Sequence, residues 1–295
     1  MPLPPQSWLA DATLLTIYGR AFGVAPILGQ LGADRGFGDM IAQVAPYVQG
    51  IAANNGGKGV RVAVHLIYGL ATPCSPGGNC LLYLDDVGVD IVKEYIEPAA
   101  KLGWLVVLDD QLGRSDPAAE TRRIIAKGYL AYDNVAIALD PEFRAAADQA
   151  TPGIPVGTVA AAELNAAQTL LDGYSAPLHP VHRKLLLIHQ FQETMIVNRA
   201  SLRLGGRYVD PVVVADGFGP PATKMDTYTQ LLGSRAAGHV RWRGLKLFYP
   251  NPYEQAGHGD YPVMTWPEVF GRATIRDLLG NSYSMQPPPD LIIIA

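Results

Sequence analysis

Eight short apolar runs, each ending at a polar or glycine-rich turn, constrain this chain more than any other feature of its sequence. Most are continuous Val, Ile and Leu stretches without strict alternation, which is typical of parallel strands covered on both faces. The runs span residues 14–18, 60–67, 104–108, 135–139, 185–188, 212–215, 244–248 and 291–294.

Segments with helical spacing of apolar residues separate these runs. They span residues 38–53, 89–102, 116–127, 160–171, 194–202, 223–232 and 267–279. The third begins with Asp116-Pro117, an N-cap residue followed by proline at the first helical position.

The strand–helix alternation and a length of 295 residues match a barrel fold that typically takes about 250 residues. An open doubly wound sheet is the alternative, but no G-x-G-x-x-G follows the first run and no phosphate-binding loop occurs. We therefore predict that residues 1–295 form one α/β domain, a (β/α)8 TIM barrel.

The charge of the chain argues against some partners. The net charge is −4, from 23 basic and 27 acidic residues, and no basic stripe of the kind that binds nucleic acid is present. No run of 18 apolar residues occurs, so we expect no transmembrane segment. We also expect no organic cofactor.

The two cysteines, Cys74 and Cys80, enclose a short loop of turn-forming residues. This spacing favours a disulfide, which suits an oxidising compartment, with two free thiols as the alternative. Residues 1–7 lack the basic and apolar regions of a signal peptide. We expect an extracellular or cell-envelope protein whose signal peptide is absent from this sequence.

Polar side chains follow or end most of the predicted strands. Because catalytic groups in such barrels come from the carboxyl ends of the strands, we expect a functional site there. A strand-end carboxylate that only caps the next helix is the alternative for any single residue. The strand-end residues are Tyr18, Arg20, His65, Asp109, Asp110, Gln111, Asp140, Glu142, His189, Gln190, Asp216 and Lys246.

The segment Asp140-Pro141-Glu142 is the sharpest of these signals. Period-two alternation along a strand would point Asp140 and Glu142 the same way, toward the barrel axis. Two carboxyl groups on one face are what most glycoside hydrolases require. We predict Asp140 and Glu142 as acid, base or nucleophile, with Asp109 and Asp216 completing the catalytic set.

Aromatic residues gather after several strands and could pack on sugar rings, although loop-to-loop packing explains any single one equally well. After the seventh strand stand Phe248, Tyr249, Tyr253, Tyr261 and Trp266, and Tyr18, Phe22, Phe143, Phe191 and Phe218 follow other strands. We predict substrate binding by Tyr18, Arg20, His65, Asp110, Gln111, His189, Gln190, Lys246, Phe248 and Trp266.

Two side-chain types leave alternatives open. Lys246 could form a Schiff base in a lyase or aldolase, but we favour an ion pair with Asp216 or Asp140. His65 and His189 could join Asp140 or Asp216 as metal ligands, yet no H-x-H or H-E-x-x-H motif supports this and we expect no metal.

Several strand-end motifs together resemble a largely uncharacterised family of secreted or lipid-anchored bacterial (β/α)8-barrel proteins that are similar to glycoside hydrolases. The resemblance covers nearly the whole chain and implies the barrel fold and an exported location. The motifs are Tyr18-Gly-Arg-Ala-Phe-Gly, Leu108-Asp-Asp-Gln, Ala138-Leu-Asp-Pro-Glu-Phe, Ile188-His-Gln-Phe, Ala215-Asp-Gly-Phe-Gly and Gly244-Leu-Lys-Leu-Phe-Tyr.

Asp140-Pro-Glu142 also resembles the Asp-x-Glu that ends the fourth strand in glycoside hydrolase families 18 and 25. The family 18 pattern has further aspartates before this pair, where this chain has residues 135–138. The family 25 pattern has acids on the first and last strands, where this chain has Arg20 and an apolar terminus. We predict a secreted glycoside hydrolase acting on a polysaccharide or cell-wall glycan, with a non-catalytic glycan-binding protein as the alternative.

Overall fold

The computed structural model describes residues 4–23, 29–75, 77–145, 156–233, 240–250, 259–277 and 279–295. Eight parallel strands form a closed barrel, because β1 pairs with β2 on one side and with β13 on the other. The barrel strands are β1 (Ala12–Gly19), β2 (Gly59–Ala71), β4 (Leu105–Asp110), β5 (Val135–Leu139), β7 (Lys184–Gln190), β9 (Val209–Ala215), β10 (Trp242–Leu247) and β13 (Leu291–Ile294). The predicted (β/α)8 TIM barrel is confirmed.

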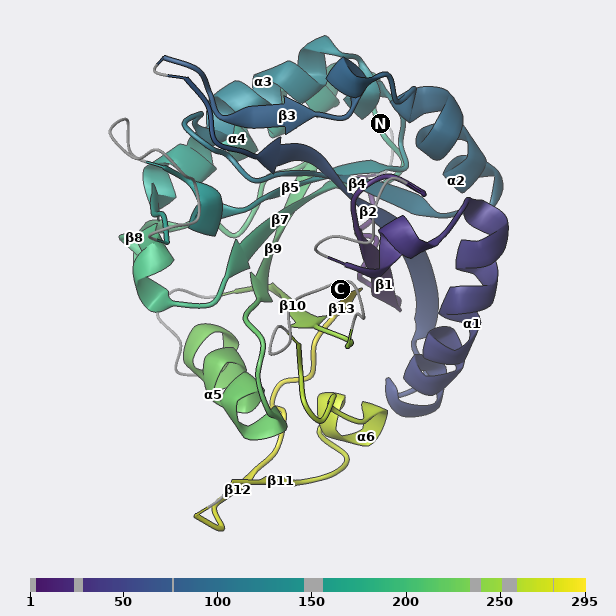
Figure 1. The fold of residues 1–295 in the computed structure, drawn as a ribbon, viewed down its shortest axis with the longest axis vertical. Helices are drawn as coiled ribbons and strands as arrows, with labels where there is room; N and C mark the ends of the chain where they lie inside the picture. The colour runs from purple at the N-terminus through teal and green to yellow at the C-terminus, as the bar shows by residue number, and fades with distance from the viewer. Residues whose placement is uncertain are drawn as a thin grey trace.

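Helices surround the barrel, as Figure 1 shows in the view down its shortest axis. They are α1 (Phe37–Asn54), α2 (Glu97–Lys101), α3 (Pro117–Ala126), α4 (Ala161–Ser175), α5 (Pro221–Leu232) and α6 (Trp266–Val269). The α3 helix begins as its sequence predicts, because the Asp116 side chain accepts a hydrogen bond of 2.9 Å from the backbone N–H of Ala119. None of the helices in these described ranges combines the length and apolar character needed to cross a membrane.

The predicted helix over residues 194–202 is wrong. The chain forms two 3-10 turns there, η7 (Glu193–Met195) and η8 (Arg199–Ser201), with the short strand β8 (Ile196–Val197) between them. Asn198 adopts a φ of 57°, a left-handed conformation that a right-handed helix cannot contain. The strand β8 pairs with β6 (Val159–Ala160), and Figure 1 shows β8 between α4 and α5, where another helix would otherwise stand.

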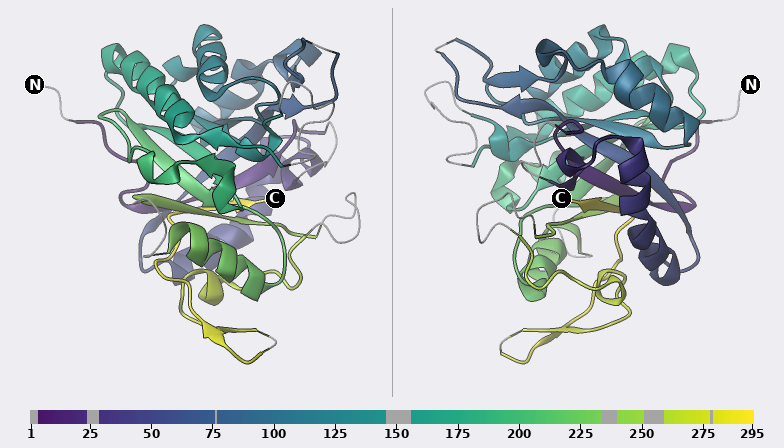
Figure 2. Two further views of the ribbon diagram at one scale, coloured as in Figure 1. Left: turned by 90° about the vertical axis from the view of Figure 1, so that its left-hand side faces the viewer. Right: turned by 45° about the vertical axis from the view of Figure 1, so that its right-hand side comes forward.

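The last predicted helix, over residues 267–279, is also too long. It ends as α6 at Val269, and Gly271 then adopts a φ of 66° that stops the helix. The chain continues into a hairpin of β11 (Ile275–Arg276) and β12 (Ser282–Tyr283), which projects from the barrel in both views of Figure 2. Residues 89–102 were also predicted to be helical, and the structure has a π-helical turn there, η3 (Val92–Ile96), which continues directly into α2.

The predicted disulfide between Cys74 and Cys80 is present. It lies in the connection between β2 and β3 (Leu81–Tyr83), and β3 returns antiparallel to β2. The disulfide therefore closes a loop at the carboxyl end of a barrel strand, on the side where the site described below is found.

Alternation along the strands divides the side chains of the barrel between two cores. One set packs outward against the helices, and the other fills the interior of the barrel. The apolar interior positions include Leu14, Ala63, Leu105, Val107, Ala136, Ala138, Leu185, Leu187, Val212, Val214, Leu291 and Ile293. Because side chains alternate with a period of two, positions two residues further along each strand also face the interior.

Candidate functional site

Polar side chains occupy the inward-facing positions at the carboxyl ends of six barrel strands. Each belongs to the same alternating series as the apolar interior residues of its strand. They are His65 on β2, Asp109 on β4, Asp140 directly after β5, His189 on β7, Asp216 directly after β9 and Lys246 on β10, and none is more than 4% exposed. So many buried ionisable groups must be paired, protonated or functional.

Asp216 and Lys246 form the ion pair of the site. Lys246 Nζ lies 3.0 Å from Asp216 Oδ2, which also accepts a hydrogen bond of 2.8 Å from His189 Nδ1. Asp216 Oδ1 accepts the N–H of Gly217 at 2.7 Å. Burial alone would raise the pKa of Asp216, but Lys246 and His189 hold it far below the usual range, so this carboxylate is ionised.

The cation of Lys246 is held by more than its partner carboxylate. Its Nζ lies 3.9 Å from the centre of the Tyr18 ring and 4.9 Å from that of Phe248, both within cation–π distance. Burial would lower the pKa of Lys246, but Asp216, Asp140 and Glu142 raise it overall. The ion pair with Asp216 is the arrangement we favoured for Lys246, and a protonated lysine lacks the lone pair that forms a Schiff base.

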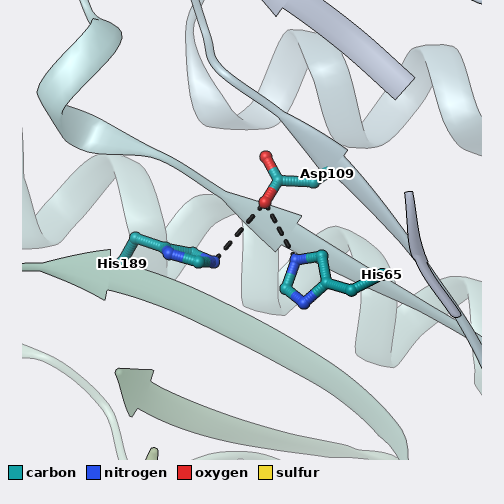
Figure 3. A group of neighbouring side chains, drawn as sticks. All are labelled: His65, Asp109 and His189. Atoms are coloured by element: carbon teal, nitrogen blue, oxygen red, sulfur yellow. Dashed lines mark hydrogen bonds and ion pairs between the residues drawn. The ribbon is translucent and has the colours of Figure 1, made fainter. Parts of the chain in front are cut away.

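Two histidines converge on Asp109 from either side, as Figure 3 shows. His65 Nε2 lies 2.9 Å and His189 Nε2 3.4 Å from the same oxygen, Asp109 Oδ2. Burial lowers the pKa of His65 to about 4, even though Asp109 acts in the opposite direction. Burial would raise the pKa of Asp109, but the two histidines bring it below its ordinary value. Asp109 is therefore ionised.

Asp140 and Glu142 do not lie on one strand face, so the predicted alternation is wrong. The strand β5 ends at Leu139, and Pro141 begins a 3-10 turn, η5 (Pro141–Phe143), that carries Glu142. The two carboxyl groups still lie close enough to interact, because Glu142 is the main charged neighbour that raises the pKa of the buried Asp140. Burial and then Asp216 raise the pKa of Glu142 to about 8.

These two carboxyl groups differ from Asp109 and Asp216 in their partners. Neither oxygen of Asp140 has a hydrogen-bond partner within the described ranges. No hydrogen bond or ion pair of the Glu142 side chain occurs there either. Asp140 is fully buried whereas Glu142 is partly exposed, so Glu142 is the member of the pair closer to solvent.

Other predicted binding residues support the barrel wall in this structure. The Arg20 guanidinium donates to the backbone carbonyls of Ile67, Tyr68 and Leu82. Gln111 Oε1 accepts the N–H of Ala71. The amide of Gln190 donates to two carbonyls of the turn that follows β7.

Asp110 lies in the outward-facing series of β4, next to Asp109. Burial and then the charge of Glu120 on α3 raise its pKa well above the usual range. Its carboxyl packs directly on Gly69 of β2, where a Cβ would come within 2.1 Å of Asp110 Oδ1. A larger residue at position 69 would therefore displace the Asp110 carboxyl, and Asp110 belongs to the packing between barrel and helices.

The aromatic residues after β10 separate in the structure. Phe248 lies in the site beside Lys246, whereas Tyr249 and Trp266 pack near Tyr47 on α1, outside the barrel wall. Tyr261 is 84% exposed, and Tyr253 lies outside the described residues. Of the two substrate-binding residues predicted here, the structure places Phe248 in the site and Trp266 outside the barrel wall.

Two further elements of the site carry no motif in the sequence. Thr16, an inward-facing residue of β1, places its Oγ1 3.3 Å from His65 Nδ1. Lys224 on α5 donates to the carbonyls of Gly217 and Lys246 and lies 3.4 Å from Asp260. Thr16 could have been found from its place between Leu14 and Tyr18, but nothing in the sequence links Lys224 to β10.

Comparison of the chain with models of known protein families and with curated proteins found no match. The geometry of these residues therefore carries the functional argument.

Proposed function

We propose that this protein hydrolyses glycosidic bonds, with Asp140 and Glu142 as the two carboxyl groups that flank the reacting bond. The observation that carries the proposal is the contrast among the four carboxyl groups of the site. Asp109 and Asp216 are held by cationic or imidazole partners, whereas Asp140 and Glu142 have no such partner in the described ranges. Unpaired carboxyl groups at the carboxyl end of a barrel strand are typical of acid–base chemistry.

The environment of Glu142 suits a proton donor. With a pKa raised to about 8, this carboxyl group is protonated at neutral pH, and its partial exposure allows contact with a substrate. It would donate this proton to the glycosidic oxygen as the bond to the leaving sugar breaks.

Asp140 suits the second role. Burial and then Glu142 raise the pKa of Asp140 well above its usual range, and the proton on Glu142 together with the charge of Lys246 acts in the opposite direction. An ionised Asp140 would either take a proton from the attacking water or bond to the anomeric carbon itself. The configuration of the released sugar, observed by proton NMR, distinguishes these routes.

The location of the protein is part of the same proposal. A disulfide between Cys74 and Cys80 persists in oxidising compartments, which favours an extracellular or cell-envelope protein acting on a polysaccharide or cell-wall glycan. Labelling of free thiols in protein taken from whole cells, with and without reductant, tests whether the bond is formed in place.

The experiment measures sugar release from a panel of polysaccharides and peptidoglycan. We compare the wild type with Glu142→Gln and Asp140→Asn, and use Asp133→Asn as a control at the opposite end of β5. Loss of a general acid costs on the order of 10²–10⁴-fold in rate, so both site variants should fall by at least that range. The control should keep its activity.

Activity should also fall as the pH rises through about 8, because the proton on Glu142 is then lost. Release that survives both substitutions would overturn the assignment of Asp140 and Glu142. No release from any substrate, with folding intact, would overturn the hydrolase and favour a glycan-binding protein.

A further inference from the structure

We propose that His65, Asp109 and His189 bind one divalent transition-metal ion of the zinc type. The proposal concerns binding and does not rest on a carbohydrate substrate. The three residues come from β2, β4 and β7, and all three are fully buried. Two imidazoles and one carboxylate are a donor set that zinc accepts, with a fourth position left for water or substrate.

The distances fit such an ion. One ligand atom from each residue lies within 4.8 Å of the other two, and the two imidazole nitrogens lie 2.9 and 3.4 Å from Asp109 Oδ2. With metal–ligand bonds of about 2.1 Å, two ligands of a tetrahedral centre lie roughly 3.4 Å apart. Figure 3 shows both rings directed at the carboxylate, so only small side-chain rotations are needed.

The partners on the far side of each ring hold the metal-binding nitrogens in place. His189 Nδ1 donates to Asp216 at 2.8 Å, and His65 Nδ1 lies 3.3 Å from Thr16 Oγ1. Histidines that bind metals almost always have such a partner on the second nitrogen, because it fixes the ring orientation and the tautomer. Both rings therefore present Nε2 toward Asp109.

The tautomer of His189 provides a second, independent reason. His189 donates its Nδ1 proton to Asp216, so the neutral ring carries a lone pair on Nε2. This lone pair faces the anionic Asp109 Oδ2 at 3.4 Å. That contact lacks hydrogen-bond geometry, and His189 Nε2 and Asp109 Oδ1 have no hydrogen-bond partner among the described residues. A cation bound between the imidazole of His189 and the carboxylate of Asp109 would give both a partner.

The charges around the barrel axis also favour a bound cation. Four carboxyl groups meet there: Asp109, Asp140, Glu142 and Asp216. Among the lysines and arginines of the described chain, Lys246 is the one that forms an ion pair with this group, through Asp216. With all four ionised and Lys246 protonated, the interior would hold three excess negative charges, and one would remain with Asp140 and Glu142 protonated. A divalent cation beside Asp109 would reduce this surplus by two.

The test uses titration of the full-length protein, first freed of metal with a chelator. Zn²⁺ binding is measured by calorimetry, and Co²⁺ binding by the visible absorption that distinguishes tetrahedral from octahedral sites. We expect one ion per chain for both metals, with weak binding of Mg²⁺, because that ion prefers an oxygen-only, octahedral shell. Failure of Zn²⁺ and Co²⁺ to bind the folded wild type would overturn the proposal.

The variants locate the ion. His189→Gln and Asp109→Asn remove ligands and should lower Zn²⁺ affinity by at least 100-fold. Thr16→Val keeps the three ligands and the side-chain shape but removes the partner of His65, so affinity should fall about 10–100-fold. This milder substitution keeps the test valid if a ligand variant does not fold, which circular dichroism checks.

The matched control is His182→Gln. His182 Nδ1 lies 2.9 Å from Asp133 Oδ2, so this pair resembles His65 and Asp109 but belongs to no three-residue ligand group in the described chain. Its loss should leave Zn²⁺ affinity unchanged. If His182→Gln weakened binding as much as His189→Gln does, the ion would lie elsewhere and the assignment would be wrong.

Discussion

The two halves of the barrel interior differ sharply although the same strands build both. Toward the amino ends of the strands, the inward positions hold aliphatic residues such as Leu14, Leu105 and Leu185. Toward the carboxyl ends, the same alternating series holds His65, Asp109, His189 and their neighbours. Burial is nearly complete in both halves, so chemistry and not exposure separates them.

This difference shows where the fold gains stability and where it gives some up. Each buried aliphatic side chain contributes about 1.5–3 kcal/mol by leaving water. Each buried charge costs free energy unless a partner offsets it, and the partners at the carboxyl end form a network spread over several strands. The first half therefore acts as a core, and the second half as a site that the core supports.

The largest expected effect comes from breaking the ion pair between Lys246 and Asp216. This pair lies in the polar half of the barrel interior, at the carboxyl ends of the strands. The substitution Lys246→Met leaves Asp216 buried without its cation, and loss of one member of a buried pair typically costs 3–5 kcal/mol. We therefore expect the free energy of unfolding of the metal-free protein at pH 7 to fall by about 4 kcal/mol, measured by denaturant titration.

A double substitution separates the charge from the packing. In Lys246→Met with Asp216→Asn the uncompensated charge is gone, so at least half of the lost free energy of unfolding should return. If the double variant were as unstable as the single one, the packing of Lys246 against Tyr18 and Phe248, and not its charge, would explain the loss.

The next effect concerns the aliphatic half. Leu187 on β7 is fully buried one inward position before His189, and Leu187→Ala removes methyl groups from a packed interior. We expect a loss of about 3 kcal/mol. Because no charge is involved, the loss should be the same at pH 5 and pH 8. A strong dependence on pH would show that the two halves are coupled through β7.

The sequence predicted the barrel well because each strand is a local apolar run, and the strand bounds in the structure lie close to those runs. All eight predicted runs overlap the barrel strands. The two helical predictions that failed cross single left-handed backbone conformations, Asn198 at φ 57° in a segment that forms no α-helix and Gly271 at φ 66° just after α6. Neither conformation changes the apolar spacing, so periodicity could not detect it.

The site was predictable to the extent that it follows the strands. Alternation places His65, Asp109 and His189 on one interior surface, since each lies on a regular strand. Alternation does not apply to Glu142, because β5 ends at Leu139 and a 3-10 turn carries the carboxyl.

The partnership between His189 and Asp216 joins β7 and β9, and depends on a register that only the folded barrel defines. The position of Trp266 against α1 likewise depends on the packing of two helices far apart in the chain. Contacts of this kind are set by the closed barrel and leave no local pattern in the sequence.

The smallest expected effect is a gain in stability, and it comes from the polar half. The pKa of Glu142 is about 8 in the folded protein against an ordinary value of 4.5. Above pH 4.5 the unfolded chain ionises this group while the folded protein keeps it protonated, so its contribution weakens folding as the pH rises toward 8. Glu142→Gln cannot ionise and should escape this loss.

We therefore expect Glu142→Gln and the wild type to have similar free energies of unfolding near pH 4, with the variant more stable by about 2 kcal/mol at pH 8. The measurement is denaturant unfolding of metal-free protein across this range, with the exposed Glu97→Gln as a control that should change stability by less than about 0.5 kcal/mol. A variant that is less stable at pH 8 would mean that the ionised Glu142 is stabilised in the fold. The polar half would then strengthen the barrel as the aliphatic half does, and the contrast between them would lose its basis.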